Sequence, residues 1–191
     1  MNLILASQSP RRKELLGLFR IPFTVRVADI DETMNPHSAP YSEVARVSRL
    51  KALAVPRDAD DVVVAADTIV VCEGNVLGKP HTADEASEML HLLSGRDHQV
   101  MTGMTVLRGD SAAVVTEVTD LHFRELTDKE IDAYVATGEP MDKAGAYGIQ
   151  GGAALFCQGI KGDYYNVMGL PVCRLTQILR ELAPELMGDM V

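Results

Sequence analysis

The stretch SQSPRRK, residues 7–13, combines features that bind anions. Ser9 followed by Pro10 predicts the cap and the first position of a helix. The N-terminus of a helix carries partial positive charge and unpaired N–H groups, so cations are unfavourable in its first turn. Three cations nevertheless occupy that turn: Arg11, Arg12 and Lys13. An anionic ligand would explain them, because hydroxyl, N–H and guanidinium groups all bind phosphate. If the three side chains bend into solvent instead, the cost is roughly a few tenths of a kcal/mol.

A single acidic residue, Asp67, interrupts the apolar run VVVAADTIVV. A buried carboxylate is costly unless it is paired, hydrogen-bonded or bound to a metal, which favours a functional role. The structural alternative is a strand end at which Asp67 caps backbone N–H groups. Glu32, in the sequence IDE, is a second acid just after a predicted strand. Two carboxylates near a phosphate-binding loop are typical of a Mg²⁺ site, although IDE alone is typical of a solvated loop.

Other motifs for phosphate and metal chemistry are incomplete. Lys79, in LGKP, is followed by proline and lacks the G-x-x-x-x-G-K-[ST] frame, which excludes a Walker motif. The glycine-rich stretch AGAYGIQGG does not match G-x-G-x-x-G, so we reject a dinucleotide site. The five histidines have no metal-binding spacing such as H-E-x-x-H. The glycines still allow a flat ligand to approach the backbone closely.

Length and composition predict one domain over residues 1–191, with two lobes and no separate linker, because 191 residues can bury a substantial core. The formal net charge of −9 disfavours a nucleic-acid polymer or an anionic membrane surface as a partner. No apolar run approaches the ~18 residues that a membrane span requires. The three cysteines form no C-x-x-C pair, which indicates reduced thiols and a cytoplasmic protein.

Hydrophobic periodicity predicts strands and helices that alternate along the chain. Strands are expected at residues 3–6, 22–28, 62–71, 98–109 and 112–126. Helices are expected from Pro10 to about Phe19, from Ser42 as the cap to Pro56, after Thr82 to Leu93, after Thr127 to Gly138, and around residues 172–182. Thr82 and Thr127 are each followed three residues later by Glu, which predicts a capping box. The pattern indicates an α/β fold with a mixed central sheet and flanking helices.

Taken together, several stretches resemble the Maf family of nucleoside triphosphate pyrophosphatases. They span nearly the full chain: LASQSPRRKELL, IDE, LKA, AADTIVV, LGKP, LSGRDHQVMTG, and DKAGAYGIQG through GDYYNVMGLP. The resemblance implies an elongated α/β fold like that of Maf proteins and inosine triphosphatases, with two lobes around a deep cleft, commonly as a homodimer. It also implies cleavage of a nucleoside triphosphate to the monophosphate and pyrophosphate with a divalent cation (Mg, Mn or Co).

The resemblance implies roles for individual residues. Asp67 falls on the position of the proton acceptor, and Glu32 and Asp67 on those of metal ligands. The remaining residues are assigned to the substrate: Ser7, Arg11, Arg12, Lys13, Lys51, Thr68, Lys79 and Gln150. Arg11, Thr68 and Gln150 together resemble the subgroup that hydrolyses dTTP and UTP. The 7-methyl-GTP subgroup typically has Gln after the catalytic Asp and Glu in place of the later Gln.

The chemistry of the residues agrees with this expectation. A triphosphate needs a cluster of cations and a metal, and a carboxylate near a metal can deprotonate the attacking water. Asp67 is either that base or the ligand of a metal whose bound water attacks, and the sequence leaves both roles open. The Gln150 amide offers a donor and an acceptor for the O4/N3 edge of uracil or thymine. The alternatives are a pyrophosphatase for 7-methyl-GTP or another non-standard nucleotide, and a non-enzymatic nucleotide-binding regulator of cell division or septum formation.

Overall fold

The computed structural model describes residues 1–27 and 29–188. The strands are β1 (Leu3–Leu5), β2 (Phe23–Val25), β3 (Val62–Cys72), β4 (Asn75–Leu77), β5 (Asp97–Arg108), β6 (Ser111–Phe123) and β7 (Cys157–Lys161). The helices are α1 (Pro10–Gly17), α2 (Pro40–Ala54), α3 (Ala83–Leu93), α4 (Asp128–Ala136), α5 (Tyr164–Val167), α6 (Val172–Leu182) and α7 (Pro184–Met187). Short 3₁₀ helices follow α4: η1 (Glu139–Asp142), η2 (Ala144–Ala146) and η3 (Gly152–Leu155). No helix in this part of the chain is long and apolar enough to cross a membrane.

The strands form one mixed sheet in the order β2-β1-β3-β5-β6-β7, with β4 paired to β3. β1 runs parallel to both β2 and β3, whereas β4 is antiparallel to β3 and β7 is antiparallel to β6. The predicted α/β class with a mixed central sheet and flanking helices is therefore confirmed. β7 was not predicted, because its sequence CQGIK lacks the apolar alternation of a half-buried strand.

The chain forms two compact units. The first comprises Met1–Asp67, Thr102–Glu117 and the chain from Gly169 onward, and the second comprises Thr68–Met101 and Val118–Met168. The boundaries fall inside β3, β5 and β6. The expectation of a single domain over residues 1–191 stays a prediction.

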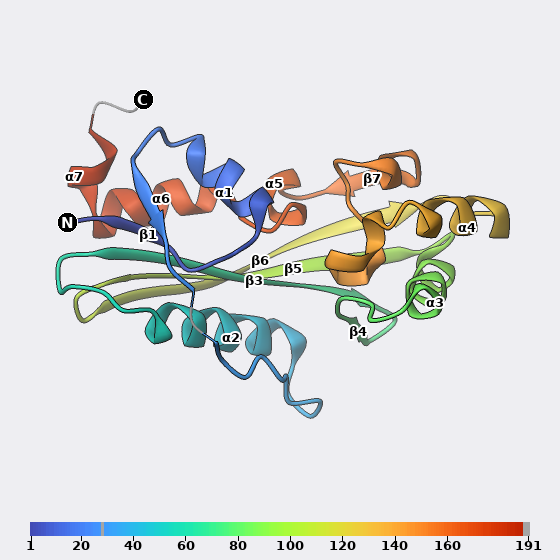
Figure 1. Ribbon diagram of the computed structural model, residues 1–191, viewed down its shortest axis with the longest axis horizontal. Helices are drawn as coiled ribbons and strands as arrows, with labels where there is room; N and C mark the ends of the chain where they lie inside the picture. The colour runs from blue at the N-terminus through green and yellow to red at the C-terminus, as the bar shows by residue number, and fades with distance from the viewer. Residues whose placement is uncertain (28, 189–191) are drawn as a thin grey trace. The chain divides into compact units, whose positions relative to one another are not determined.

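In the first unit, α1 and α6 lie on one face of the strands and α2 lies on the other (Figure 1). A buried apolar cluster joins α2 and the loop that follows it to β1, β3 and β5; it consists of Ile4, Ala6, Ala52, Val55, Val63, Ala65 and Leu107. Successive strand residues point to opposite faces, so Asp67 shares the α2-facing side of β3 with Val63 and Ala65. The carboxylate is thereby directed to the face on which α2 packs.

Helix α2 is fixed to β5 by a buried polar contact. The hydroxyl oxygens of Ser48 and Thr105 lie 2.8 Å apart in a hydrogen bond. The helix begins at Pro40, with Ala39 as its cap, and the prediction that Ser42 caps it is wrong. Proline is pre-organised for the first helical position and lacks the N–H that would be unpaired there, so the helix starts three residues earlier than predicted.

The predicted caps are confirmed in part. Ser9 accepts a hydrogen bond from the N–H of Arg12, and α1 ends at Gly17, short of Phe19. Thr127 and Glu130 form the complete capping box of α4. At α3, the Thr82 hydroxyl caps the N–H of Glu85, but the Glu85 carboxylate accepts from the N–H of His81 at 2.7 Å. The carboxylate therefore binds the backbone one residue before the position that a capping box requires.

Aromatic rings form much of the core of the second unit. His98, Phe123 and Tyr147 contact one another edge to face, with ring centroids 4.8 to 5.5 Å apart. Phe156 joins Phe123 to Tyr134 of α4 in the same geometry. The cluster anchors the chain on both sides of residues 148–155, since Tyr147 precedes Gly148 and Phe156 follows η3.

Candidate functional site

The first unit brings predicted site residues together where β1 ends beside the middle of β3. β1 ends at Leu5, which pairs with Val64 of β3. The N–H of Ala6 still donates to the Val64 carbonyl, so the chain leaves the sheet through Ser7 close to Asp67, three residues beyond Val64. In sheets of this kind, ligands bind where the chain leaves the carboxyl ends of parallel strands.

Lys51 joins the two predicted carboxylates. Its Nζ donates to Glu32 Oε2 and to Asp67 Oδ1, each at 2.8 Å. The Lys51 and Asp67 side chains are 15% and 13% exposed, whereas Glu32 is 57% exposed and so forms the solvent side of the group. Lys51 lies in the last turn of α2, one residue before the buried Ala52. The packing of α2 on β3 therefore sets this ion-pair geometry.

Arg12 is held by the protein itself. Its Nε donates to the carbonyl oxygen of Gly169 at 2.7 Å, and its Nη1 donates to the Ser7 hydroxyl at 3.4 Å. Burial lowers the pKa of Arg12, while the negative charges of Asp67 and Glu32 act to raise it. An arginine remains charged in proteins despite such shifts. The guanidinium thus adds a fixed positive charge within the field of both carboxylates.

The cations of the first helical turn differ in their surroundings. Arg11 and Arg12 are half-buried, whereas Lys13 is exposed. The alternative in which all three side chains bend into solvent is therefore wrong for Arg12, because the Gly169 carbonyl and the Ser7 hydroxyl hold it. The role of Gly169 was missed, although the residue lies in the stretch NVMGLP that carried the family resemblance.

The donor set of this group suits a divalent cation that also binds phosphate. Glu32 Oε2 and Asp67 Oδ1 converge on one point, where Lys51 Nζ lies. No group of three or more His, Cys, Asp or Glu that could hold a metal occurs within residues 1–27 and 29–188. One or two carboxylates, completed by substrate phosphates and water, are the usual protein ligands of Mg²⁺. Glu32 and Asp67 fit that pattern.

The other predicted site residues belong to the second unit, where three segments pack together. The N–H of Gly145 donates to the carbonyl of Gly78, the neighbour of Lys79, at 3.0 Å. A Cβ on Gly145 would lie 2.7 Å from Cγ2 of Val70, which shares a strand face with Thr68. Gly145 also lies five residues before Gln150. The segments that carry Thr68, Lys79 and Gln150 are thus brought to one place.

The second-unit side chains differ in exposure. Thr68 is half-buried in β3, whereas Lys79 and Gln150 are exposed. Gln150 lies in a turn that is closed by the hydrogen bond from Gly151 N–H to the Gly148 carbonyl at 3.0 Å. The predicted residues therefore form two groups. Ser7, Arg11, Arg12, Lys13, Glu32, Lys51 and Asp67 belong to the first unit, and Thr68, Lys79 and Gln150 to the second.

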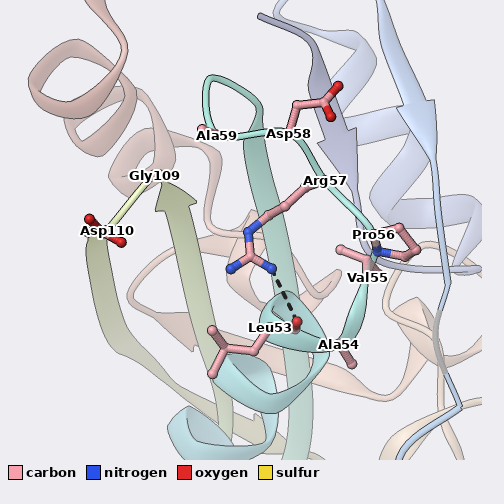
Figure 2. Close-up of a pocket in the computed structure, with 9 residues that line it drawn as sticks. All are labelled: Leu53, Ala54, Val55, Pro56, Arg57, Asp58, Ala59, Gly109 and Asp110. Atoms are coloured by element: carbon pink, nitrogen blue, oxygen red, sulfur yellow. Dashed lines mark hydrogen bonds between the residues drawn. The ribbon is translucent and has the colours of Figure 1, made fainter.

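A separate pocket of about 540 Å³ lies at the C-terminal end of α2 (Figure 2). It is lined by residues 53–59 together with Gly109 and Asp110, and contains none of the predicted site residues. Figure 2 shows the Arg57 guanidinium directed at the Leu53 carbonyl, to which Nη1 donates at 3.1 Å. This cation satisfies a carbonyl at the helix end, and we assign no ligand to the pocket.

Comparisons with known proteins identify the family of the chain. The family model described as Maf-like protein matches residues 2–182. A dTTP/UTP pyrophosphatase of Bacillus cereus (strain B4264) is 49% identical over 181 residues, covering 94% of this chain and 95% of the relative. A dTTP/UTP pyrophosphatase of Bacillus anthracis (strain CDC 684 / NRRL 3495) has the same identity and coverage. A HAM1 protein from Coxiella burnetii shares the fold, with a TM-score of 0.51 at 16% identity over 95% of this chain and 99% of that one. The chain therefore belongs to the Maf-like protein family.

Proposed function

We propose that this protein is a nucleoside triphosphate pyrophosphatase that hydrolyses dTTP and UTP to the monophosphate and pyrophosphate. The observation that carries the proposal is the joining of Asp67 and Glu32 through Lys51, within the field of the fixed Arg12. Curated relatives at 49% identity are named dTTP/UTP pyrophosphatase. The match with the Bacillus cereus relative covers 94% of this chain and 95% of that relative.

In the proposed reaction, Asp67 accepts a proton from a water molecule, whose oxygen attacks the α-phosphorus. The bond from that phosphorus to the bridging oxygen breaks, and pyrophosphate leaves with the electron pair. Arg12 and Lys51 stabilise the negative charge that develops on the phosphate oxygens, as fixed cations do in phosphoryl transfer. Ser7, Arg11 and Lys13 extend the anion-binding loop, and Lys79 contributes a further exposed cation.

We also propose that the reaction requires a divalent cation, Mg, Mn or Co, held by Glu32 and Asp67. When bound, such an ion neutralises phosphate charge and acts as a Lewis acid. In the nucleotide-free protein, Lys51 Nζ donates to both of these carboxylates. An excess of chelator should stop pyrophosphate release, and Glu32→Gln should raise the metal concentration needed for half-maximal activity. Unchanged turnover in chelator would contradict the metal proposal.

Thr68 and Gln150 are proposed to select the base. The exposed Gln150 amide can pair with the O4 and N3–H groups of uracil or thymine. A site built to bind one edge rejects a mismatched base, because its own polar groups are then left unpaired. Gln150→Glu should weaken dTTP use, since a carboxylate repels the O4 carbonyl.

The protein is further proposed to act as a homodimer in the cytoplasm. Cys72, Cys157 and Cys173 are free cysteines, which is typical of a reducing compartment. The net charge of −9 supports a small-molecule substrate over a nucleic-acid polymer or an anionic membrane. Light scattering during size-exclusion chromatography should give the mass of a dimer, and a monomer mass would contradict the assembly proposed.

The test of substrate class is pyrophosphate release over dTTP, UTP, CTP, GTP and 7-methyl-GTP, compared as kcat/KM. We expect dTTP and UTP to be the best substrates. Preference for 7-methyl-GTP would overturn the choice of base but not the reaction. Binding of nucleotides without turnover of any would favour the non-enzymatic regulator instead.

A further inference from the structure

The turn that carries Gln150 rests on two buried or half-buried side chains of the second unit. Its residues Gly148–Gly151 are followed directly by η3, which begins at Gly152. The N–H of Gly148 donates to the Tyr134 hydroxyl at 3.0 Å, and the N–H of Gly152 donates to Glu139 Oε2 at 3.1 Å. The backbone is therefore bound on both sides of Gln150.

The two supporting side chains are bound to each other. The Tyr134 hydroxyl donates to Glu139 Oε1 at 2.9 Å, so a continuous chain of hydrogen bonds runs from Gly148 N–H through Tyr134 and Glu139 to Gly152 N–H. Tyr134 is 5% exposed, and its burial raises the pKa of the hydroxyl, which keeps the proton that it donates. The Glu139 carboxylate is the centre of this network.

The turn lies directly on the carboxylate. A Cβ on Gly151 would collide with Glu139 Oε1, and a Cβ on Gly148 would lie 2.7 Å from Cε of Lys143. Lys143 in turn donates from Nζ to the Glu139 carbonyl at 2.6 Å. The glycines on either side of Gln150 are thus explained by close approach to Glu139 and Lys143. The same approach leaves the turn little freedom to shift.

We propose that Glu139, acting with Tyr134, is a positioning residue that fixes the Gln150 turn and thereby sets the base selectivity of the enzyme. The inference rests on the proposed function and adds two residues to it. An amide discriminates between base edges only if its backbone is held, because a loose turn lets the side chain adjust to either edge. The Gln150 amide makes no hydrogen bond within the described chain, so its placement depends on this backbone support.

The test compares dTTP with CTP in Glu139→Gln and Tyr134→Phe. Glu139→Gln keeps the size of the side chain but replaces one acceptor oxygen with a donor group. Tyr134→Phe removes the hydroxyl between Gly148 and Glu139. For each variant we expect the ratio of kcat/KM for dTTP over CTP to fall about tenfold, mainly through a higher KM for dTTP, the size of effect that one lost hydrogen bond has. Glu88→Gln, an exposed carboxylate on α3, is the matched control and should leave the ratio unchanged.

A purely structural role would not move this ratio, because loss of folded enzyme lowers activity on both nucleotides equally. Gln150→Ala supplies a second check. In the Gln150→Ala background, Glu139→Gln should cause no further change in the ratio, since Glu139 affects base selectivity only through the Gln150 side chain. Ratios within twofold of the wild type for both Glu139→Gln and Tyr134→Phe would overturn the proposal. Additive effects of Glu139→Gln and Gln150→Ala would do the same.

Failure of the proposed function is distinguishable from failure of this inference. Selectivity is also measured as the ratio of the Kd values for CTP and dTTP. Equilibrium binding gives these values and requires no turnover. If the wild type binds dTTP preferentially but releases no pyrophosphate, the proposed reaction is wrong, and the variants still test the positioning role by binding. A wild-type protein that does not distinguish the two nucleotides by either measurement would overturn the inference.

Discussion

Lys51 Nζ lies 2.8 Å from Asp67 Oδ1 and 2.8 Å from Glu32 Oε2, so that one ammonium group forms ion pairs with two carboxylates. The three side chains come from a helix, a strand and a loop, and Lys51 is 19 residues from Glu32 and 16 residues from Asp67. The ammonium group occupies the position at which a divalent cation would be attracted most strongly to both carboxylates. Lys51 and a metal ion are therefore expected to compete in the nucleotide-free protein.

Replacement of Lys51 tests this competition. Lys51→Met should bind Mn²⁺ more tightly than the wild type in the absence of nucleotide, because the carboxylates no longer share a protein cation. Turnover of dTTP should nevertheless fall by about 100-fold or more, since a cation that stabilises the phosphate is lost. Calorimetric titration with Mn²⁺ measures the first effect. Lys129→Met, on an exposed face of α4, is the control. Equal Mn²⁺ affinity in Lys51→Met and the wild type would contradict the competition.

Arg12 is expected to stabilise the empty protein as well as the bound nucleotide. A hydrogen bond from a charged group to a backbone carbonyl contributes about 2 kcal/mol, so Arg12→Ala should lower the free energy of unfolding by that amount. Loss of the Gly169 contact is thus expected to outweigh the relief of the unfavourable interaction between Arg12 and the helix dipole, which is roughly a few tenths of a kcal/mol.

Urea titration with and without dTTP separates the two roles of Arg12. Lys13→Ala, at an exposed position of the same helical turn, should change the stability of the empty protein by less than about 0.5 kcal/mol. The increase in melting temperature on addition of triphosphate should be smaller in Arg12→Ala than in the wild type. Equal stability of empty Arg12→Ala and wild type would show that the Gly169 contact contributes nothing.

The buried His98 is expected to make the stability of the second unit sensitive to acid. Burial lowers the pKa of His98 to about 4 in the folded protein, while the Arg96 carbonyl and Asp97 act to raise it and His122 to lower it. The ring Nε2 and the Tyr147 hydroxyl lie 2.9 Å apart in a hydrogen bond. Between the ordinary pKa of 6.5 and about 4, the unfolded chain binds a proton at this site that the folded chain does not. The contribution of His98 to the free energy of unfolding is therefore fully present above pH 6.5 and is lost as the pH falls toward about 4.

The size of that loss is about 3 kcal/mol if the full pKa shift is realised. His98→Phe removes the titrating group, so its free energy of unfolding should decrease less than that of the wild type between pH 7 and pH 4.5. Denaturant titrations at the two pH values measure the difference. Identical decreases in His98→Phe and the wild type would contradict the assignment.

The sequence predicted the parts of the site that depend on local pattern. The apolar run around Asp67 predicted the strand that carries the carboxylate, and Ser9 with Pro10 predicted the start of α1. These features follow from side-chain period and capping chemistry, which act over a few residues.

Contacts that depend on the packing of distant elements were not predictable in this way. The pairing of Lys51 with Asp67 requires the position of α2 on β3, which is set by the apolar cluster and by the Ser48–Thr105 contact. Glu139 was not considered as a site residue, because nothing near it in sequence shows that Gly152 donates to it. The segment after Gly138 was recognised as glycine-rich, but its three 3₁₀ helices have no simple periodic signal.

The measurement that tests the central claim most directly is pyrophosphate release from dTTP by the wild type and by Asp67→Asn, alongside dTTP binding to both. Asparagine keeps the shape of the side chain but cannot accept the proton from water. We expect pyrophosphate and dTMP as the products of the wild type, and a rate at least about 100-fold lower in Asp67→Asn with dTTP binding retained. A rate for Asp67→Asn within a few-fold of the wild type, or release of orthophosphate by the wild type, would contradict the account.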